Sequence, residues 1–408
     1  MISKNLLKDY AKLLTEKGLN VQKGQYVVVR CDVDQPEFVY MVVNEAYKLG
    51  AKKVFVDFEM QKIKALSYKK QSQKSLNFIE EFAVSKLKWT AETLPAILYL
   101  VSEDPFGFTS VKAEKLTKTR AAQYPVIKPF RKAMEGKYQW CIAAVPGKAW
   151  AKRIFPDLSA PKAVDALWNA ILKAALVDGD AIGNWDKHNK FIKDKCDYLN
   201  SLHVKTLRYS SANGTDFSVE LNKDGLFLGG MEKTLSGVTY NPNIPSYEIF
   251  TTPVAGRCEG TVVSTKPLSY QGKIINNFSI TFENGEVKSV KAEQGEDLLK
   301  QLVALDDGSK KLGEVALVPF DNPINNSGIL FYETLFDENA CCHLALGQGF
   351  IETLKGYENM TDEEIRAAGV NDSMLHEDFM IGSADLKIVA ETFDGKKITI
   401  FEKGNWAK

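Results

Sequence analysis

The sequence predicts a chain in two parts, an N-terminal α/β domain with a parallel sheet over residues 1–200 and a mostly antiparallel, β-rich domain over residues 201–408. Two observations lead to this fold class. In the first half, apolar strand patterns alternate with helical patterns, which is typical of parallel α/β sheets. In the second half, short strand patterns follow one another across tight turns, which is typical of antiparallel sheets. With 408 residues, the chain is long enough to bury a core in each part.

The first half begins with an amphipathic helix and continues into alternating strands and helices. Ser3 can cap the first helix, and Gly18 can end it. The strand at 26–29, the helix at 36–49 and the strand at 54–56 predict a right-handed parallel βαβ unit. Two later strands are almost continuously apolar, so we expect a sheet that is covered on both faces. The elements predicted for this half are the helices 3–17, 36–49, 163–176 and 186–202 and the strands 26–29, 54–56, 96–100 and 140–145.

The second half contains two strong hairpin signals. Asn284-Gly285 and Asp394-Gly395 each lie between two apolar strand patterns, and such dipeptides favour the type I′ turn of a two-residue hairpin loop. Helices are fewer here. One is predicted over residues 295–305, and a second, over 362–368, is opened by the capping pattern that begins at Thr361.

The balance of charges and the cysteine content limit the classes of partner and the cellular compartment that we expect. Lys plus Arg equals Asp plus Glu, at 52 each, so neither nucleic acid nor an anionic membrane surface is expected as the main partner. No uncharged apolar run is long enough to span a membrane, and the first residues lack the apolar segment of a signal peptide. The six cysteines are scattered, without a Cys-x-x-Cys pair, which fits free thiols in a reducing cytoplasm.

Five polar residues of the second half indicate a metal centre. On an extended strand His376 and Asp378 share one face, which offers a metal ion both nitrogen and oxygen ligands. Glu259, Glu314 and His343 are each embedded in an apolar strand pattern, and a buried carboxylate is costly unless it is paired or binds a metal ion. We read each of these alone as an ordinary strand residue. Together they favour one metal-binding site.

These residues lie in stretches that resemble the aminopeptidase T and aminopeptidase S type of metallopeptidase. The matching stretches are 248–253, 259–262, 313–316, 339–347 and 376–382. The first half is similar more diffusely, so the resemblance covers most of the chain. It implies that the β-rich domain is the catalytic, metal-binding one, and that the α/β domain helps to form the substrate cavity and a homodimer.

The resemblance also implies a function and a ligand set. The expected activity is that of a metal-dependent aminopeptidase, which removes N-terminal residues from peptides with a free N-terminus by means of a water activated by two metal ions. The ions would be zinc, cobalt or manganese, and the ligands would be Glu259, Glu314, His343, His376 and Asp378. Glu314 would bridge the two ions, and Glu259 is the candidate general base.

One departure from the family pattern concerns catalysis rather than metal binding. Seven residues after the first histidine the family has a tyrosine, and this chain has Phe350, which lacks a hydroxyl group. Either activity is lowered, or Tyr357 substitutes, or the chain is a weakly active or inactive relative that binds peptides or amino acids. A further alternative is a cysteine hydrolase that uses Cys341 or Cys342 beside His343, although Cys342 faces away from the imidazole on a strand.

Overall fold

The predicted strand at 26–29 forms part of β1 (Tyr26–Asp32), an inner strand of a parallel sheet with the order β2-β1-β3-β4-β9. This computed structural model describes residues 2–407 of the chain. Each neighbouring pair of strands in this sheet is parallel, as the alternation of strands and helices predicts. The other four strands are β2 (Lys53–Glu59), β3 (Ala96–Val101), β4 (Trp140–Ala144) and β9 (Asn243–Ile244).

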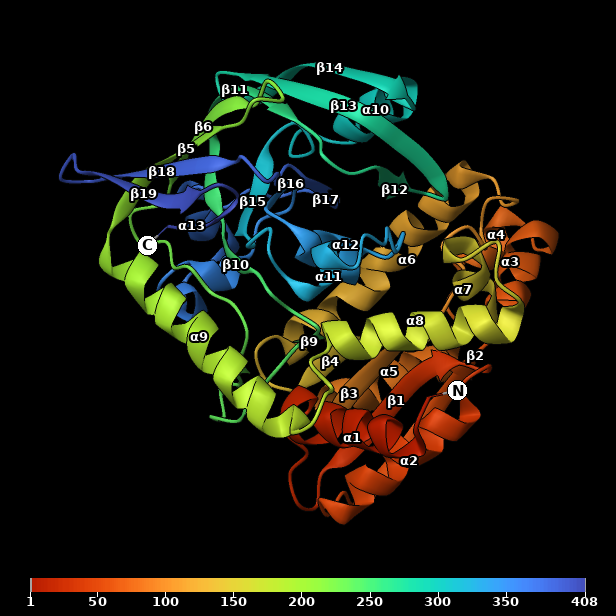
Figure 1. Ribbon diagram of the computed structural model, residues 1–408. Helices are drawn as coiled ribbons and strands as arrows, with labels where there is room; N and C mark the ends of the chain where they lie inside the picture. The colour runs from red at the N-terminus through yellow and green to blue at the C-terminus, as the bar shows by residue number, and fades with distance from the viewer. Residues whose placement is uncertain (1, 408) are drawn as a thin grey trace. The chain divides into compact units, whose positions relative to one another are not determined.

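Helices cover this sheet through apolar contacts. Val28 of β1 packs in a cluster with Met134 of α6 and Trp89 of α5. Elsewhere Tyr10 of α1 packs against Phe38 of α2 and donates a hydrogen bond to the backbone oxygen of Ala144. The helices of this region, shown in Figure 1, are α1 (Lys4–Leu13), which continues as a π-helical turn to Gly18, α2 (Pro36–Lys48), α3 (Gln61–Lys70), α4 (Gln73–Asn77), α5 (Glu81–Thr93), α6 (Ala113–Met134), α7 (Lys148–Ile154), α8 (Ala160–Ala174) and α9 (Ala181–Ser201).

The chain divides into two compact units at a place different from the predicted boundary. The first unit runs to Lys187 and includes Met231–Pro245, and the second comprises His188–Gly230 and the chain from Ser246 onward. The division therefore falls inside α9, before residue 200. The return segment carries β9 and the short hairpin of β7 (Glu232–Lys233) and β8 (Thr239–Tyr240). No change in composition marks this return.

The second unit contains two antiparallel sheets, and the α/β plus antiparallel β fold class is confirmed. The larger sheet has the order β12-β13-β11-β6-β5-β18-β19-β20, with β14 paired to β13, and the smaller has the order β10-β15-β16-β17. Both sheets contribute to one apolar core, in which Phe217 of the larger sheet and Val315 and Phe379 of the smaller are buried. The smaller sheet consists of β10 (Ile249–Thr251), β15 (Leu312–Leu317), β16 (His343–Gly347) and β17 (His376–Met380).

The elements of the larger sheet and its helices complete this unit. The strands are β5 (Val204–Ser210), β6 (Asp216–Leu221), β11 (Pro253–Val263), β12 (Leu268–Tyr270), β13 (Lys273–Glu283), β14 (Glu286–Gln294), β18 (Lys387–Thr392), β19 (Lys397–Glu402) and β20 (Asn405–Trp406). The helices are α10 (Glu296–Val303), α11 (Pro323–Asn326), α12 (Thr334–Asp337) and α13 (Asp362–Ala367). The capping box predicted at Thr361 is present.

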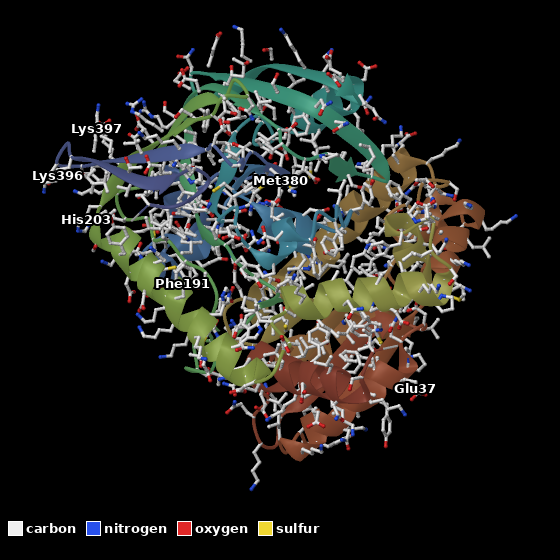
Figure 2. All side chains as sticks on the ribbon, viewed as in Figure 1. Glu37, Phe191, His203, Met380, Lys396 and Lys397 are labelled. Atoms are coloured by element: carbon white, nitrogen blue, oxygen red, sulfur yellow. The ribbon has the colours of Figure 1, made fainter. Side chains whose placement is uncertain are left out.

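Both predicted hairpins form, but only one has the predicted turn. Asn284 and Gly285 have φ angles of 53° and 78°, as a type I′ turn between β13 and β14 requires. Between β18 and β19 only Gly395 has a positive φ angle, so the type I′ prediction for Asp394-Gly395 is wrong. Asp394 instead accepts a hydrogen bond from the Thr392 hydroxyl in a longer loop. In Figure 2 Lys396 projects from this loop, whereas Met380 lies inside the unit.

Candidate metal centre

The pairing of three neighbouring strands brings four of the five predicted ligands to one face of the smaller sheet. Ala345 of β16 lies opposite Glu314 of β15 on one side and opposite Asp378 of β17 on the other. His343 is two residues from Ala345, and His376 is two residues from Asp378. Because side chains on a strand alternate between faces, all four side chains point to the same side. The predicted shared face of His376 and Asp378 is thus found.

Glu314 lies between the two imidazoles. Its Oε1 is 4.0 Å from Nε2 of His343, and its Oε2 is 3.2 Å from Nε2 of His376. Two candidate ligand groups result, which share this carboxylate. One is formed by Glu248, Glu314 and His343, and the other by Glu314, His376 and Asp378. In each group the ligand atoms lie within 4.8 Å of one another.

Glu248 is a candidate ligand that the sequence analysis did not assign. It immediately precedes β10, and one of its carboxylate oxygens is 3.3 Å from Nε2 of His343. The backbone N–H of Tyr247 donates a hydrogen bond to Oδ1 of Asn339, which fixes the chain at this point. The side-chain amide of Asn339 in turn donates to the backbone oxygen of Leu335. The sequence shows only that Glu248 is an acid just before an apolar strand. This pattern does not distinguish a metal ligand from a solvated loop residue.

A second missed residue, Glu338, lies beside the ligand groups. It belongs to the short 3-10 helix Glu338–Ala340, which precedes β16. Burial raises the pKa of its carboxyl group well above the ordinary value, and the negative charges of Glu248, Asp378 and Glu314 raise it further. These interactions identify Glu338 as a neighbour of both ligand groups.

Glu259 is not part of this cluster, so its prediction as a ligand and general base is not supported. The residue is exposed on β11, in the larger sheet. Its Oε1 accepts a hydrogen bond of 2.6 Å from the backbone N–H of Asn284. Glu259 therefore stabilises the β13–β14 turn. The apolar neighbours in its strand pattern face the core, while its own side chain points to the other side of the sheet.

Burial and mutual charge determine the protonation of the cluster. Burial raises the pKa of the Glu314 carboxyl group to about 7, although the hydrogen bond with His376 opposes this shift. For His343 burial alone would lower the pKa, but its hydrogen bond to Glu248 and the nearby carboxylates raise it to about 9. For His376 burial would likewise lower the pKa, but the interactions with Asp378 and Glu314 outweigh burial and raise the pKa to about 11. Without a bound cation, Glu314 and the two imidazoles therefore hold protons more tightly than the free side chains do, whereas the pKa of Asp378 is lowered.

The donor set fits divalent metal ions. Within the described residues, the buried Oδ1 of Asp378 makes no hydrogen bond, although Nε2 of His376 lies 3.4 Å away. Glu248, Glu314 and Asp378 are each at most 8% exposed, and carboxylates that converge in a buried site are costly without a cation. Mixed carboxylate and imidazole donors suit zinc, cobalt and manganese. The residues present therefore fit the metal-binding role.

The imidazoles are oriented by backbone oxygens on their far side. Nδ1 of His376 is 2.8 Å from the backbone oxygen of Gln348, and Nδ1 of His343 is 3.4 Å from that of Cys341. A carbonyl oxygen only accepts, so each Nδ1 carries the proton and each Nε2 faces the carboxylates. This arrangement is typical of metal-binding histidines.

Phe350 lies against the site. The centroid of its ring is 4.8 Å from that of His376 and 5.1 Å from that of Phe250. Its backbone N–H donates a hydrogen bond to the Thr252 hydroxyl group. Tyr357, the proposed substitute, packs instead in an apolar cluster around Leu354.

The two cysteines beside His343 are held in structural roles. Sγ of Cys342 hydrogen-bonds with the backbone of Val318, and Sγ of Cys341 lies 3.9 Å from the Thr265 hydroxyl. Burial raises the pKa of both thiols, which disfavours the nucleophilic thiolate. The cysteine hydrolase alternative therefore gains no support.

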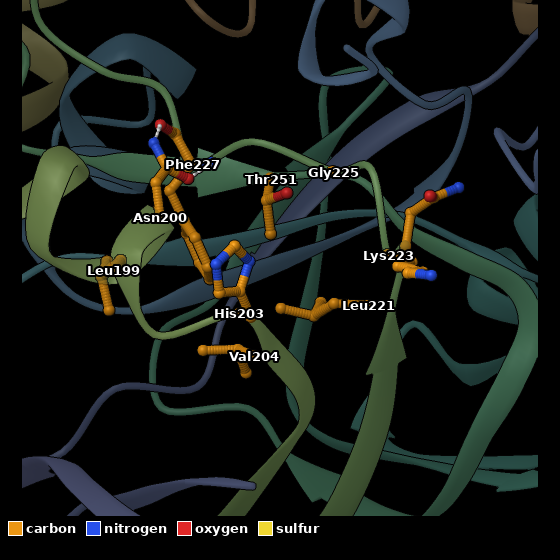
Figure 3. Close-up of a pocket in the computed structure, with 10 residues that line it drawn as sticks. Leu199, Asn200, His203, Val204, Leu221, Lys223, Gly225, Phe227 and Thr251 are labelled. Atoms are coloured by element: carbon orange, nitrogen blue, oxygen red, sulfur yellow. Dashed lines mark hydrogen bonds between the residues drawn. The ribbon is translucent and has the colours of Figure 1, made fainter. Parts of the chain in front are cut away.

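Among residues 2–407, the candidate ligand groups do not include the other two histidines. Nε2 of His188 is 2.7 Å from the backbone oxygen of Ser246, and burial lowers its pKa. His203 lines a small cavity of about 20 Å³ with Asn200 and Phe227, shown in Figure 3. That volume suits roughly one water molecule, and no carboxylate lines it. Within the described residues, neither histidine belongs to a candidate ligand group.

The fold combines an α/β unit with an antiparallel β unit, and its cluster of carboxylates and imidazoles fits divalent metal ions. Comparison with known protein families identifies the family. The model of the thermophilic metalloprotease (M29) family matches residues 3–406. The chain belongs to this metalloprotease family. Within the described residues, no helix is both long enough and apolar enough to cross a membrane.

The chain resembles its relatives over nearly its whole length. It is 40% identical to aminopeptidase AmpS of Bacillus subtilis over 403 residues, which cover 98% of each chain. It is 34% identical to aminopeptidase T of Thermus aquaticus, again over 98% of each chain. The solved structure of wild-type AmpT from Thermus thermophilus superposes with a TM-score of 0.92 at 33% identity, over 99% of this chain and 100% of that one.

Proposed function

We propose that the protein is a metal-dependent aminopeptidase that removes the N-terminal residue from peptides. One observation carries this proposal. Two ligand groups share Glu314 on one face of a buried sheet, in a chain that belongs to a metalloprotease family. The relatives whose names state an activity are aminopeptidases, which supports a peptide with a free N-terminus as the substrate.

The ligand groups would hold two divalent ions, zinc, cobalt or manganese. Glu248 and His343 would hold one ion, His376 and Asp378 the other, and Glu314 would contribute to both sites. When bound, such a pair polarises the scissile carbonyl group and lowers the pKa of a water molecule. The chain itself supplies the rigid sheet that orients the donors. It also supplies the backbone oxygens that keep the proton on Nδ1 of each imidazole.

Glu338 replaces Glu259 as the candidate general base. Its carboxyl group lies beside the ligand groups, and burial with neighbouring carboxylates raises its pKa. A carboxylate with a raised pKa can take a proton from water and return it to the departing amine. Glu338 would carry this proton on a carboxylate oxygen. The neighbouring negative charge would also favour the ammonium group of a peptide N-terminus.

A second candidate function is a peptide- or amino-acid-binding protein with weak or no hydrolysis. Phe350 favours it, because its ring occupies the space next to His376 without bringing a hydroxyl group there. A lost hydrogen-bond donor to a developing oxyanion typically costs about 3 kcal/mol of transition-state stabilisation. This alternative keeps the metal centre and changes only the turnover.

The deciding experiment is an assay of the metal-loaded protein on one peptide in free and N-blocked forms. An aminopeptidase releases the N-terminal residue from the free peptide only. The Glu314→Ala variant should lose this activity, because both ligand groups contain Glu314. The matched control is Glu259→Ala, which removes an exposed glutamate from the same unit. Metal uptake without release of the residue would favour the binding protein.

Quaternary structure and location are also part of the proposal. We expect a cytoplasmic homodimer. The six cysteines are free and buried, which is compatible with a reducing compartment. Light scattering coupled to size-exclusion chromatography tests the dimer, for which a mass near twice 45.5 kDa is expected.

A further inference from the structure

His376 occupies the least protected position of the proposed ligand set. It is the first residue of β17, which lies at the edge of the smaller sheet. Its side chain is 27% exposed, whereas that of His343 is 1% exposed. Strand pairing therefore restrains this imidazole less than the other, and its orientation depends on the turn that precedes it.

Gln348 binds both the imidazole and that turn. Its backbone oxygen is 2.8 Å from Nδ1 of His376. Its backbone N–H donates to the oxygen of Leu375 at 2.6 Å, and its Oε1 accepts from the backbone N–H of Ser373 at 3.0 Å. The position of the Gln348 carbonyl group, which keeps the proton on Nδ1 of His376, therefore depends on residues 373–375.

Asp306, which is distant in the sequence, forms hydrogen bonds with two residues of this turn. One carboxylate oxygen accepts a hydrogen bond of 2.7 Å from the Ser373 hydroxyl, and the other accepts one of 2.7 Å from the backbone N–H of Met374. It also accepts from the backbone N–H of Ser309 at 2.8 Å. These hydrogen bonds lower the pKa of the Asp306 carboxyl group, although burial opposes the shift.

We propose that Asp306 is a positioning residue, which fixes residues 373–375 against Gln348 and thereby aims Nε2 of His376 at Glu314 and Asp378. Asp306 itself is not in either candidate ligand group. The inference rests on the proposed metal centre, to which it adds a residue outside the ligand set. A group that hydrogen-bonds a metal-binding histidine typically changes metal affinity by about 10- to 100-fold when it is removed. Asp306 acts on such a group, Gln348, through residues 373–375, so we expect an effect at the lower end of that range.

The test measures Co²⁺ affinity of the full-length protein by competition with a chelator. Asp306→Ala should weaken affinity by about 10-fold, and Ser373→Ala, which removes one hydroxyl group, should weaken it by a smaller factor. Asp306→Asn keeps one acceptor oxygen, so its loss of Co²⁺ affinity should be smaller than that of Asp306→Ala. The matched control is Asp394→Ala, which removes a loop aspartate that accepts from Thr392 in the same unit. It should leave Co²⁺ affinity unchanged.

Thermal unfolding of the metal-free variants separates positioning from general stability. If Asp306→Ala lowers the melting temperature while its Co²⁺ affinity equals that of the wild type, the positioning role is wrong. If Asp306→Ala does not fold, Ser373→Ala decides, and unchanged affinity in that variant overturns the inference. His376→Ala distinguishes the two proposals. If it leaves Co²⁺ affinity unchanged, the metal centre itself fails, whereas weaker binding in His376→Ala but not in Asp306→Ala refutes the positioning role alone.

Discussion

At the scale of single residues, the site depends on buried carboxylates whose negative charge is balanced only by the neighbouring imidazoles. Glu314 is 3% exposed and approaches both imidazoles, so its burial is tolerated because partners surround it. Removing one partner of a buried ionic group typically costs about 3–5 kcal/mol, since the other charge is left uncompensated. The ligands are therefore coupled, and their substitutions are not expected to be additive.

The metal-free protein should lose stability as the pH rises from about 6.5 to about 9. The pKa of His343 is raised from 6.5 to about 9 in the folded protein, because Glu248 and other carboxylates outweigh the effect of burial. The folded state thus binds this proton more tightly than the unfolded state. The resulting stabilisation is complete below pH 6.5 and is lost as the pH passes 9.

Melting temperatures of the chelated protein across this range test the prediction. His343→Gln should show a flatter profile, because it lacks the titrating group. A wild-type melting temperature that stays constant from pH 6.5 to 9 would contradict it.

Phe350→Tyr should increase turnover of a peptide substrate. The new hydroxyl group would supply a donor next to His376, and one such donor is typically worth about 100-fold in kcat. The measurement is kcat of the metal-loaded variant. Phe250→Tyr is the control, because Phe250 contacts the Phe350 ring in an edge-to-face arrangement, and it should leave kcat unchanged. Equal rates for Phe350→Tyr and the wild type would show that hydrolysis does not need this hydroxyl.

At the scale of elements, the sequence predicts strands and helices better than their pairing. The apolar runs at β1, β3 and β4 and the hairpin at Asn284 were predictable from local pattern. The helices between residues 61 and 134 were not predicted. Lysine-rich faces obscure their periodicity, and α6 contains two internal prolines.

The same limit applies to the site. Four of the proposed ligands could be predicted, Glu314 and His343 as polar residues within apolar strands and His376 and Asp378 from their shared strand face. Glu248 lies just before β10 and Glu338 lies in a 3-10 helix, so strand alternation gives no orientation for either residue, and neither could be predicted. Glu259 matched the strand pattern but lies in the other sheet, and only the pairing of distant strands distinguishes it from Glu314.

Gly347→Ala should destabilise the end of β16 and weaken metal binding. Gly347 has a φ angle of 101°, and an added Cβ would lie 2.2 Å from the backbone oxygen of Leu375. Strain of this kind costs on the order of 1–3 kcal/mol. Because Gly347 pairs with His376, the displacement should reach the imidazole.

Chemical denaturation and Co²⁺ titration measure the two effects. Gly395→Ala is the control, since its φ angle is also positive but, apart from its chain neighbours, no described residue lies within 4 Å of the added Cβ. It should lose stability without losing Co²⁺ affinity. Unchanged metal binding in Gly347→Ala would disprove the link between this turn and His376.

At the scale of the whole molecule, metal binding and folding of the second unit should be coupled. An ion that binds only the folded state stabilises it by about 2.7 kcal/mol when its concentration is 100 times the dissociation constant. We therefore expect a chelator to lower the melting temperature by roughly 5–10 °C. Glu314→Ala should be insensitive to the chelator, because both ligand groups contain Glu314. An equal shift in that variant would place the responsible ion elsewhere.

The late return of β9 to the first unit has a consequence for synthesis on the ribosome. β9 pairs with β4, which is made about 100 residues earlier. The chain leaves the ribosome from its N-terminus at about 5–20 residues per second. The edge of β4 therefore stays open for roughly 5–20 s while α9, β5 and β6 emerge. During that interval the nascent chain presents an apolar strand edge, a favoured target for chaperones or for neighbouring nascent chains on a crowded polysome.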